Sequence, residues 1–530
     1  MKKILILIAL LILGWAGSTW FIGNKTEELL QNYLKQSQKS YADMGMDAQF
    51  DIKDYKKSFL KSTATTSFSL NTGDPTLDGL LKDIQFNNTI SHGPVLLADG
   101  TPKFGTALIH STLDMDALQP EVKEFLNKLF ADKNPLSSTM IFGLNNTADY
   151  NISIPEMNIN EKKIDLKLND GIHISGTIDK QTLTGTAKGT IGNWDILADK
   201  QKFTLSASTI DMNMKGMIAG QMLGDMKFSL PSVNLELTSL PMPVSFGVDI
   251  TTDTQKTDDT SIASEMTLSL ANIKAPVDVS AINFNTTFKG LQIKGLEQFA
   301  DIQKEMSTLQ TGALNENMSE AEQQALMEKL KSLPTILTSA IQNILKKDQT
   351  TVTIKLDATS SQGKALLDLD TRYVGNGVDI NLEEIAVGGL PAIMKIMEGS
   401  FNFSAPKSMI AITPAALMMP IFIDKGLIQE NADQYSISTQ FKGDSITLNN
   451  KAMTPHEFIA LIETIAGPPA GMPPQGLEAP DGAGLPAGGI PEGLLEELAK
   501  QNIEDLKAQG LPKEIIQQVE EFKNKATASE

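Results

Sequence analysis

Apolar and polar residues alternate with a period of two over much of the chain from about residue 49 to residue 295. In Met226-Lys-Phe228-Ser-Leu230, for example, every second residue is apolar, and the alternation resumes at Val233-Asn-Leu235. Successive side chains of a β-strand point to opposite faces of its sheet, so the pattern predicts strands with one apolar and one polar face. Similar runs begin near residues 164, 172, 203, 244, 266 and 284, and short turns such as Asn169-Asp-Gly171 separate them. Strands joined by short turns predict an antiparallel meander.

A sheet of this length has to hide its apolar face from water. It can close on itself, fold over as two layers, or curl into an open trough that something else fills. The alternation is compatible with all three arrangements. We therefore predict a mainly β fold with helical insertions (α+β), built on a long antiparallel meander that forms a curled trough or a two-layer sheet.

Helical periodicity interrupts the alternation in several places. Residues 26–42 place Leu29, Leu30, Tyr33 and Leu34 on one side of a short helix. A longer helical stretch covers 296–347, where Ser319 and Glu322 have the spacing of a capping box. Strands are predicted again from Thr351 and at 366–370, 378–382, 400–403 and 436–448, with a short helix at 415–430.

These patterns divide the chain into six parts. Residues 467–491 are dominated by Pro, Gly and Ala, which is typical of an extended linker without a core. The segments are a signal-anchor or transmembrane segment (1–24), an N-terminal helix with a β-rich region (25–295), a helical insertion (296–347), a second β-rich region (348–466), the linker (467–491) and an amphipathic helical tail (492–530).

The N-terminal segment has the pattern of a membrane anchor. Twenty uncharged residues, Ile4 to Gly23, follow Lys2 and Lys3, and a helix of that length reaches about 30 Å, the thickness of a bilayer's hydrocarbon layer. We predict that residues 4–23 cross the bacterial inner membrane once, with the basic end in the cytoplasm and the body in the periplasm. The alternative is a signal peptide that is cleaved after Ala16-Gly17-Ser18. Both interpretations export the chain.

Composition narrows the classes of partner. The formal net charge is −19 and Arg372 is the only arginine, which disfavours nucleic acid and anionic lipid surfaces as partners, because both bind Lys/Arg-rich fields. The absence of cysteine excludes disulfides, thiolate zinc sites and cysteine nucleophiles. With 23 methionines and only 6% aromatic residues, the chain favours adaptable apolar surfaces.

The histidines do not form a recognisable metal motif. A zinc site needs three or four convergent ligands, often two on one local element, whereas His92, His110, His173 and His456 are far apart in the sequence. His456-Glu457 lacks the second histidine of a metalloprotease helix. His92, directly before Gly93-Pro94, is interpreted as a turn residue whose side chain bonds the backbone, in preference to a general base.

The densest carboxylate group is Asp368, Asp370, Asp379, Glu383 and Glu384. Paired carboxylates could bind calcium or hydrolyse a glycosidic bond. Asp368 and Asp370 alternate with leucines, however, so we interpret them as the solvated face of a strand. Nucleophile elbows, phosphate-binding loops and dinucleotide fingerprints are missing from the sequence. We therefore predict no catalytic, cofactor-binding or metal-binding residue and no cofactor.

Two local patterns resemble the YdgA-like family of bacterial envelope proteins, whose function is not established. They are Tyr55-Lys-Lys-Ser58-Phe59 followed by Lys61-Ser62-Thr63-Ala64, and Ile90-Ser91-His92-Gly93-Pro94. The likeness runs from residue 1 to about residue 450 and implies a periplasmic protein held by an uncleaved N-terminal segment, with no assigned catalytic residue. It does not cover the linker and the tail. The β region is also similar in general texture to AsmA-like proteins, whose troughs carry lipids, although no motif is shared.

Three hypotheses for the function follow. The first is a non-enzymatic, membrane-anchored periplasmic protein whose β body binds or transfers a lipid-like amphiphile. The second is an envelope scaffold that self-associates or binds an envelope protein through residues 492–530. The third is an envelope hydrolase built around His92, Asp368 or Asp370.

Overall fold

A computed structural model describes residues 47–466, except for short gaps at 72–77, 80, 99, 162–163, 180, 183, 200, 239–241, 277, 314–319, 376–379 and 412, and, before residue 47, residues 19, 23, 25–28, 30–39 and 41–42. The chain divides into two compact units, Met1–Leu382 and Glu383–Glu530. The predicted linker (467–491) and tail (492–530) lie outside the described residues, as does the predicted anchor (1–24) apart from Thr19 and Gly23. Of the helices that the structure describes, none combines the length and the apolar character needed to cross a membrane.

The first unit begins with a helix and a series of strands. Helical residues at 25–28, 30–39 and 41–42, here called the N-terminal helix, precede the sheet. The strands β1, β2, β3, β6, β7 and β8 then pair antiparallel, each with the next. Their bounds are Asp47–Lys56, Lys61–Asn71, Ile84–His92, Ala107–Leu113, Ser137–Phe142 and Thr147–Ile154. Between β3 and β6, the strands β4 (Val95–Ala98) and β5 (Thr101–Phe104) form a separate hairpin.

In the middle of the unit, most of the long strands of the sheet are interrupted and divide into two shorter strands. Its elements are β9 (Met157–Glu161), β10 (Ile164–Leu168), β11 (Ile172–Asp179), β12 (Gly185–Ile191), β13 (Trp194–Ala198), β14 (Gln201–Leu205), β15 (Ser208–Ile218) and β16 (Gln221–Glu236). One series of antiparallel pairs runs β8, β11, β12, β15, β16, and a second runs β9, β10, β13, β14, β16. Strand β16 pairs with the last strand of each series, β15 and β14. The short strands are therefore consecutive halves of long strands, such as β10 with β11 and β12 with β13, and each long strand is interrupted near its middle.

The breaks in these strands form a line across the sheet, here called the crease. It passes Asp170-Gly171, Gly192-Asn193, Ser206-Ala207 and Pro231-Ser232. Asp170 and Gly171 both have positive φ (62° and 61°), and the Gly192 N–H donates to the Gly171 carbonyl at 2.8 Å. A bulge inserts one extra residue into a strand and bends it. The extra residue at Pro231-Ser232 keeps Leu230 and Val233 on one face, which explains the interruption of the sequence alternation.

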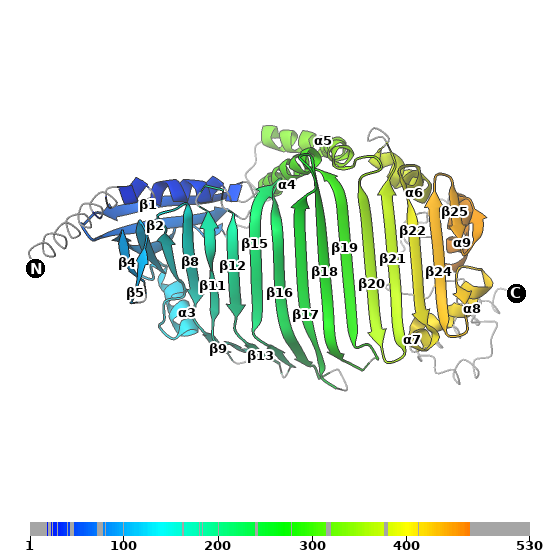
Figure 1. The fold of residues 1–530 in the computed structure, drawn as a ribbon, viewed down its shortest axis with the longest axis horizontal. Coiled ribbons are helices and arrows are strands. Elements are labelled where there is room, and N and C mark those ends of the chain that lie inside the picture. The colour runs from blue at the N-terminus through cyan, green and yellow to red at the C-terminus, as the bar shows by residue number, and fades with distance from the viewer. Residues whose placement is uncertain are drawn as a thin grey trace, which may run out of the picture. The chain divides into compact units, whose positions relative to one another are not determined.

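The sheet then continues through five long strands, as Figure 1 shows. They are β17 (Val244–Lys256), β18 (Ser261–Lys274), β19 (Ala281–Gln292), β20 (Thr351–Ser360) and β21 (Gly363–Tyr373). Helices α4 (Ile293–Ala313) and α5 (Glu320–Ile344) are inserted between β19 and β20, which pair directly, and both helices lie against β19. The helical insertion predicted at 296–347 is therefore present. Among the described residues of this unit, β1 pairs only with β2, and β21 only with β20, so the sheet is open.

The second unit mixes helices with a small antiparallel sheet. Its helical elements are α6 (Leu382–Ile396), α7 (Lys407–Ala411), the 3₁₀ helix η1 (Pro414–Met418), α8 (Met419–Asp424) and α9 (Pro455–Ala466). Its strands are β22 (Met397–Pro406), β23 (Gln429–Glu430), β24 (Gln434–Lys442), β25 (Ser445–Leu448) and β26 (Lys451–Met453). β24 pairs with β22, β23 and β25.

The mainly β fold with a long antiparallel sheet is as predicted, but several local predictions are wrong. Of the strand predicted at 378–382, the described residues 380–382 form no strand, because α6 begins at Leu382. The helix predicted at 415–430 is split into η1 and α8, and its end is β23. Helix α3 (Pro120–Phe130), with proline at its first turn, lies between β6 and β7 and was not predicted.

Candidate functional site

One face of the first unit's sheet is apolar across many strands. Cross-strand partners lie on the same face of a sheet, so the register identifies this face directly. One row of successive partners is Phe228, Ile250, Leu268, Phe284, Leu356 and Leu367. The neighbouring row is Leu230, Val248, Leu270, Ile282, Ala358 and Ala365. We call the surface that carries these rows the apolar face.

The apolar face continues across the crease. Phe246 lies two residues before Val248 in β17 and pairs with Val233, so both stay on the same face. The register then extends this surface through β14, β13 and β10. The partners there are Leu205, Phe203, Trp194, Ile196, Leu168 and Leu166. The apolar surface is therefore continuous across the crease.

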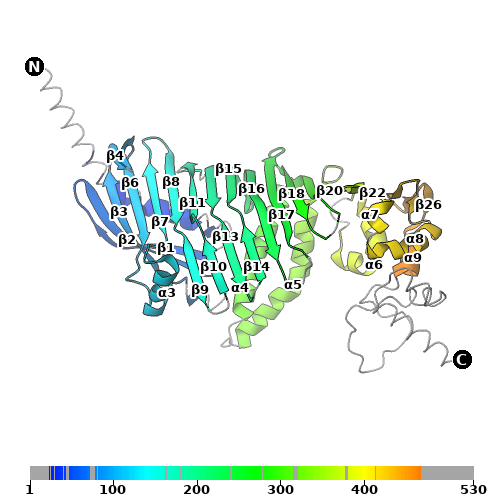
Figure 2. The ribbon, with the colours of Figure 1, turned by 90° about the horizontal axis from the view of Figure 1, so that it is seen from below.

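No second sheet of described residues covers the apolar face. Every residue in its two rows over β16–β21 is half-buried except Leu356, which is 36% exposed. On an adjacent position of the same face, Met266 is 39% exposed. Inner residues of a two-layer sandwich would be buried between the layers. Figure 2 shows the strands β15–β18 as one layer of sheet, with the helices α4 and α5 drawn alongside it. The structure thus contradicts a closed or two-layer sheet and leaves the open arrangement.

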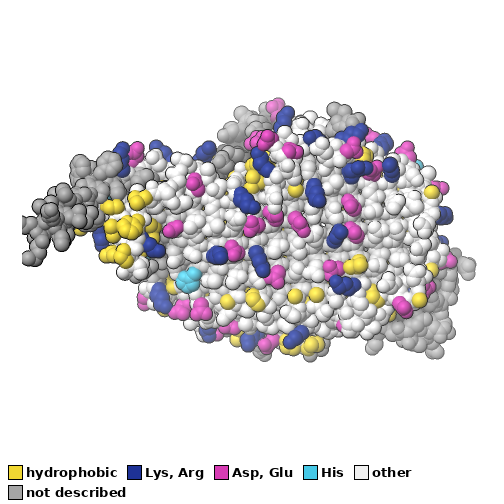
Figure 3. All heavy atoms as spheres, viewed as in Figure 1, with side chains coloured by type: hydrophobic (Ala, Val, Ile, Leu, Met, Phe, Trp, Pro, Cys, Tyr) yellow, Lys and Arg dark blue, Asp and Glu magenta, His cyan; other side chains and the backbone are white. Residues whose placement is uncertain are grey.

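The opposite face is polar and solvated. A row of partners on it is Lys227, Thr251, Thr267, Asn285, Lys355 and Asp368. Figure 3 shows Lys, Asp and Glu side chains scattered over this part of the molecule. The Asp368 carboxylate is 44% exposed and pairs with the Lys355 ammonium at 3.8 Å, and Asp370 is exposed. Both aspartates thus lie on the polar face of β21, although one carboxylate oxygen of Asp368 is buried.

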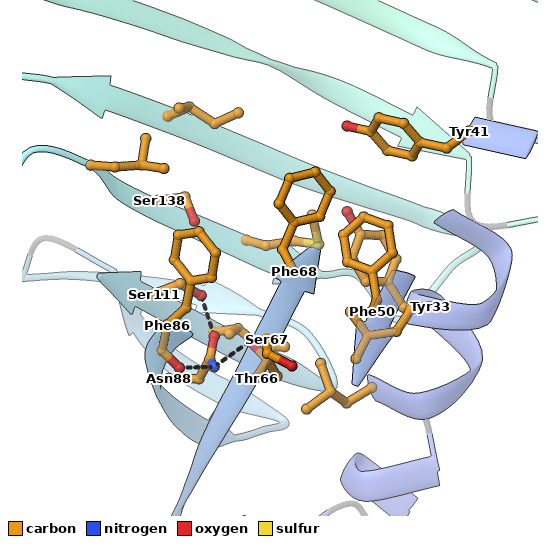
Figure 4. Close-up of a pocket in the computed structure, with 16 residues that line it drawn as sticks. Tyr33, Tyr41, Phe50, Thr66, Ser67, Phe68, Phe86, Asn88, Ser111 and Ser138 are labelled. Atoms are coloured by element: carbon orange, nitrogen blue, oxygen red, sulfur yellow. Dashed lines mark hydrogen bonds between the residues drawn. The ribbon is translucent and has the colours of Figure 1, made fainter. Parts of the chain in front are cut away.

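A cavity of about 320 Å³ lies between the N-terminal helix and the apolar side of β1–β8. Figure 4 shows aromatic rings from the helix and the strands around it. Phe50 and Phe68 are cross-strand partners with ring centroids 5.1 Å apart, and Tyr41 lies 5.6 Å from Phe50. The lining residues are Leu30, Tyr33, Leu34, Tyr41, Phe50, Thr66, Ser67, Phe68, Phe86, Asn88, Ile109, Ser111, Leu136, Ser138, Met140 and Ile152. None of them carries a charge, and burial raises the pKa of Tyr33, which keeps its hydroxyl neutral.

Three polar side chains of this cavity, Asn88, Thr66 and Ser111, bond one another. The buried Asn88 amide donates to the Ala64 carbonyl at 3.1 Å and to the Thr66 hydroxyl at 3.0 Å. Its carbonyl oxygen accepts a hydrogen bond from Ser111. A buried polar group whose bonds are made within the protein offers little to a ligand. The cavity therefore suits an apolar chain better than a polar headgroup.

The cavity and the apolar face form one surface. Ile152 lines the cavity and pairs with Ile174. The same row continues through Gly189 and Ile210 to Phe228, where the uncovered part of the face begins. An apolar path therefore runs from beneath the N-terminal helix to β21.

The two motif segments of the sequence meet around His92. Ser62 pairs with Ile90 across β2 and β3, and the His92 N–H donates to the Leu60 carbonyl at 3.0 Å. The His92 ring is 3% exposed. Its Nδ1 lies 3.0 Å from the Phe59 carbonyl oxygen and its Nε2 lies 3.0 Å from the Ser62 hydroxyl. A carbonyl only accepts, so Nδ1 carries the proton, and Nε2 bonds the Ser62 hydroxyl. Both nitrogens are occupied, which favours the structural role over a general base.

The structure does not bring the hydrolase candidates together. His92 lies at the end of β3, whereas Asp368 and Asp370 lie in β21. His110 and His173 are exposed and bond Thr139 and Ser153, respectively, and His456 lies in α9. Glu384 pairs with Lys395 at 3.0 Å, while Asp379 lies outside the described residues. Among the residues that the structure describes, no group of three His, Asp or Glu side chains is placed to hold a metal ion.

The sequence alone did not point to the cavity. The alternating residues in β1–β3 predicted an apolar face. The strands β6–β8, which complete the lining, come much later in the sequence, so local patterns could not place them beside β2. The apolar side of residues 26–42 was the available signal, because an amphipathic helix beside a one-faced sheet has to cover part of that face.

Comparison with known proteins gives one match. The sequence model of a family described as "Bacterial protein of unknown function (DUF945)" matches residues 1–456. No curated protein and no solved structure matches the chain. The match includes both motif segments, the N-terminal helix and the whole apolar face.

Proposed function

Because this chain belongs to DUF945, a family of bacterial proteins of unknown function, we propose its function from the surface that the fold leaves open. The proposed function is to bind a lipid-like amphiphile on the apolar face and to hand it on, without catalysis. The observation that carries the proposal is the uncovered apolar surface that runs continuously from the cavity to β21. The hydrocarbon part of the ligand would lie on this surface, with its polar end towards water.

The size of the surface supports an occupant. Monomeric proteins rarely expose contiguous apolar patches of more than a few hundred Å². Ten strands, β8, β11, β12 and β15–β21, lie side by side here. Nine spacings of about 4.8 Å give a path of roughly 40 Å. Each methylene group of a ligand that leaves water for this surface contributes about 0.8 kcal/mol.

The side chains of the face fit a ligand of variable shape. Its rows combine Leu, Ile, Val and Phe, and Met212, Met226 and Met266 lie on adjoining positions. Methionine is unbranched and polarizable, so it adapts to different partners. No guanidinium or carboxylate on the apolar rows selects one headgroup, which supports recognition by the hydrocarbon part.

We place this activity in the periplasm, beside the inner membrane. The support is the uncharged stretch at residues 4–23 behind Lys2 and Lys3, together with the narrower likeness to YdgA-like proteins. The scaffold alternative rests on residues 492–530, which lie outside the described part of the chain, so it stays a prediction. Deleting residues 467–530 would test it, because a scaffold would lose its assembly while the body stays folded.

Two neighbouring pairs of residues provide a direct test with a matched control. Ile250 and Leu268 are cross-strand partners on the apolar face, and Thr251 and Thr267 are partners on the polar face, one residue along each strand. We expect that Ile250→Asp combined with Leu268→Lys removes co-purifying lipid, because the new charges would lose hydration against a hydrocarbon chain. Thr251→Asp combined with Thr267→Lys adds the same charges on the solvated face, and we expect that it leaves the lipid in place.

The measurement is native mass spectrometry of the full chain after gentle extraction from bacterial membranes. Thermal unfolding of both variants shows whether they fold. If the charged variant does not fold, the variant Ile250→Thr with Leu268→Thr replaces it, because threonine is polar but favours strands. A lipid-free wild-type protein, or equal lipid content in both charged variants, would contradict the proposed function.

A further inference from the structure

The β4–β5 hairpin carries apolar residues on both of its faces. Leu96 and Ala98 are buried, and they pack against Leu108 and Ile141 of the main sheet. Val95 pairs with Phe104 on the other face, where Leu97 also lies. These three side chains are 41%, 73% and 69% exposed, respectively. A hairpin held only by the sheet beneath it would carry polar residues on its outer face.

A second exposed apolar pair adjoins the hairpin. Phe59 and Leu60 lie in the turn between β1 and β2 and are 48% and 49% exposed. Their carbonyl oxygens accept hydrogen bonds from the ring and the backbone N–H of His92, three residues before Val95. We call Phe59, Leu60, Val95, Leu97 and Phe104 the tip patch. Figure 3 shows a cluster of hydrophobic side chains at this end of the molecule.

The surroundings of the tip patch are basic, although the whole chain has a net charge of −19. Lys57 and Lys61 flank the Phe59-Leu60 turn, and Lys103 precedes Phe104; all three are exposed. The net charge of the chain disfavoured an anionic lipid surface, but docking depends on the charge near the contact, because charges more than about 10 Å apart are largely screened at 0.1 M salt. Apolar side chains inside a lysine rim are complementary to an anionic bilayer surface.

The end of the uncharged N-terminal stretch lies at the same corner. Gly23, its last residue, is buried, and a Cβ built on it would lie 2.6 Å from Nδ1 of His92. Thr19 and Thr26, on either side, are 0% and 1% exposed. The chain of about twenty residues that precedes the body therefore ends beside the residue that leads into the hairpin.

From the exposed tip patch, its lysine rim and the position of Gly23, we propose that the tip patch docks on an anionic phospholipid bilayer and places its five apolar side chains at the interface. The cavity under the N-terminal helix then lies at the membrane end of the sheet. Docking requires neither a ligand on the apolar face nor the transfer proposed above.

The absence of cysteine allows a site-specific test on the full chain. Leu97→Cys and Phe104→Cys are labelled separately with an environment-sensitive fluorophore. Leu366→Cys is the control, because Leu366 is 47% exposed on the polar face of β21. The labelled chains are reconstituted into vesicles of three parts phosphatidylethanolamine to one part phosphatidylglycerol, with a quencher on the acyl chains. We expect quenching of about twofold or more at positions 97 and 104 and little at position 366.

Three outcomes decide the inference. Equal and weak quenching at all three positions would overturn it. So would labels at 97 and 104 that are shielded from an aqueous quencher but not reached by the lipid quencher, because a second copy or another protein would then cover the patch. Lys57→Glu, Lys61→Glu and Lys103→Glu together should reduce the quenching in these vesicles, and an unchanged signal would contradict the role of the basic rim. A chain that docks but carries no lipid would support this inference and overturn the proposed function.

Discussion

Gly192→Ala is expected to destabilise the first unit by more than about 4 kcal/mol, a magnitude that needs a specific steric or polar defect. Gly192 lies on the crease, and a Cβ added there would lie 1.5 Å from the Asn169 carbonyl oxygen. Backbone atoms on both sides would have to move. The hydrogen bond from the Gly192 N–H to the Gly171 carbonyl, which joins neighbouring strands at the crease, would be lost with them. The apolar face on both sides of the crease would no longer be aligned.

Gly189→Ala provides the matched control, because Gly189 lies in β12, three residues before Gly192. The nearest atom to a Cβ at position 189 is a side-chain carbon of Ile174 at 3.4 Å, an ordinary contact. We expect a change of less than about 1 kcal/mol there. Chemical unfolding of both variants, followed by circular dichroism, measures the difference. Similar midpoints for the two variants would show that the crease does not hold the sheet together.

His92→Ala is expected to cost about 3 kcal/mol of stability, because it leaves the Phe59 carbonyl and the Ser62 hydroxyl without their partner inside the protein. It also opens space beneath Gly23, which packs on the ring. The expected effect is structural, so it should appear in unfolding measurements and not depend on any substrate.

A double-mutant cycle tests this role. Ser62→Ala should cost less in the His92→Ala background than in the wild type, because the shared hydrogen bond is already gone. His110→Ala is the control, since His110 is exposed on the polar face, and its loss should change stability by less than about 0.5 kcal/mol. If His92→Ala left stability unchanged while it altered a cellular phenotype, the structural role would be wrong and the hydrolase hypothesis would regain a candidate.

The strand pattern was the most predictable part of the fold, because alternation is a local property. The interruption at Pro231-Ser232 is informative in retrospect. It separates two alternating runs whose phases differ by one residue, and a bulge is the device that restores one face across such a shift. If several alternating runs are interrupted at the same distance from the turns that join them, the interruptions predict a line of strand breaks such as the crease.

Local pattern could not predict what covers the face. A run such as Val248, Ile250 and Thr252 alternates in the same way in a barrel, a sandwich and an open sheet, since only non-local pairing separates these folds. The cavity depends on contacts between the N-terminal helix and β6–β8, which are likewise non-local. The strand predicted at 378–382 is wrong for the described residues 380–382, because Leu382 begins α6.

For the candidate site residues, too, local properties could be predicted from the sequence and non-local contacts could not. Alternation with leucine placed Asp368 and Asp370 on a solvated strand face, and local sequence sufficed for that. The His-Gly-Pro turn suggested a backbone-bonded His92, but the partner Ser62 is thirty residues away and became evident only from the pairing of β2 with β3. The exposed apolar side of the β4–β5 hairpin could not be predicted. The run Val95-Leu-Leu-Ala98 in β4 is apolar throughout, which is typical of a strand that is buried on both faces.

Photo-crosslinking tests the central claim most directly. The full chain is reconstituted with phospholipid that carries a photoactivatable group in its acyl chain, and the adducts are mapped to single residues by peptide mass spectrometry. The account predicts adducts on apolar-face residues such as Phe228, Leu268 and Phe284 and in the cavity at Ile152, with none on their polar-face neighbours Lys227, Thr267 and Asn285. Adducts confined to the polar face, or their absence from β15–β21, would contradict it.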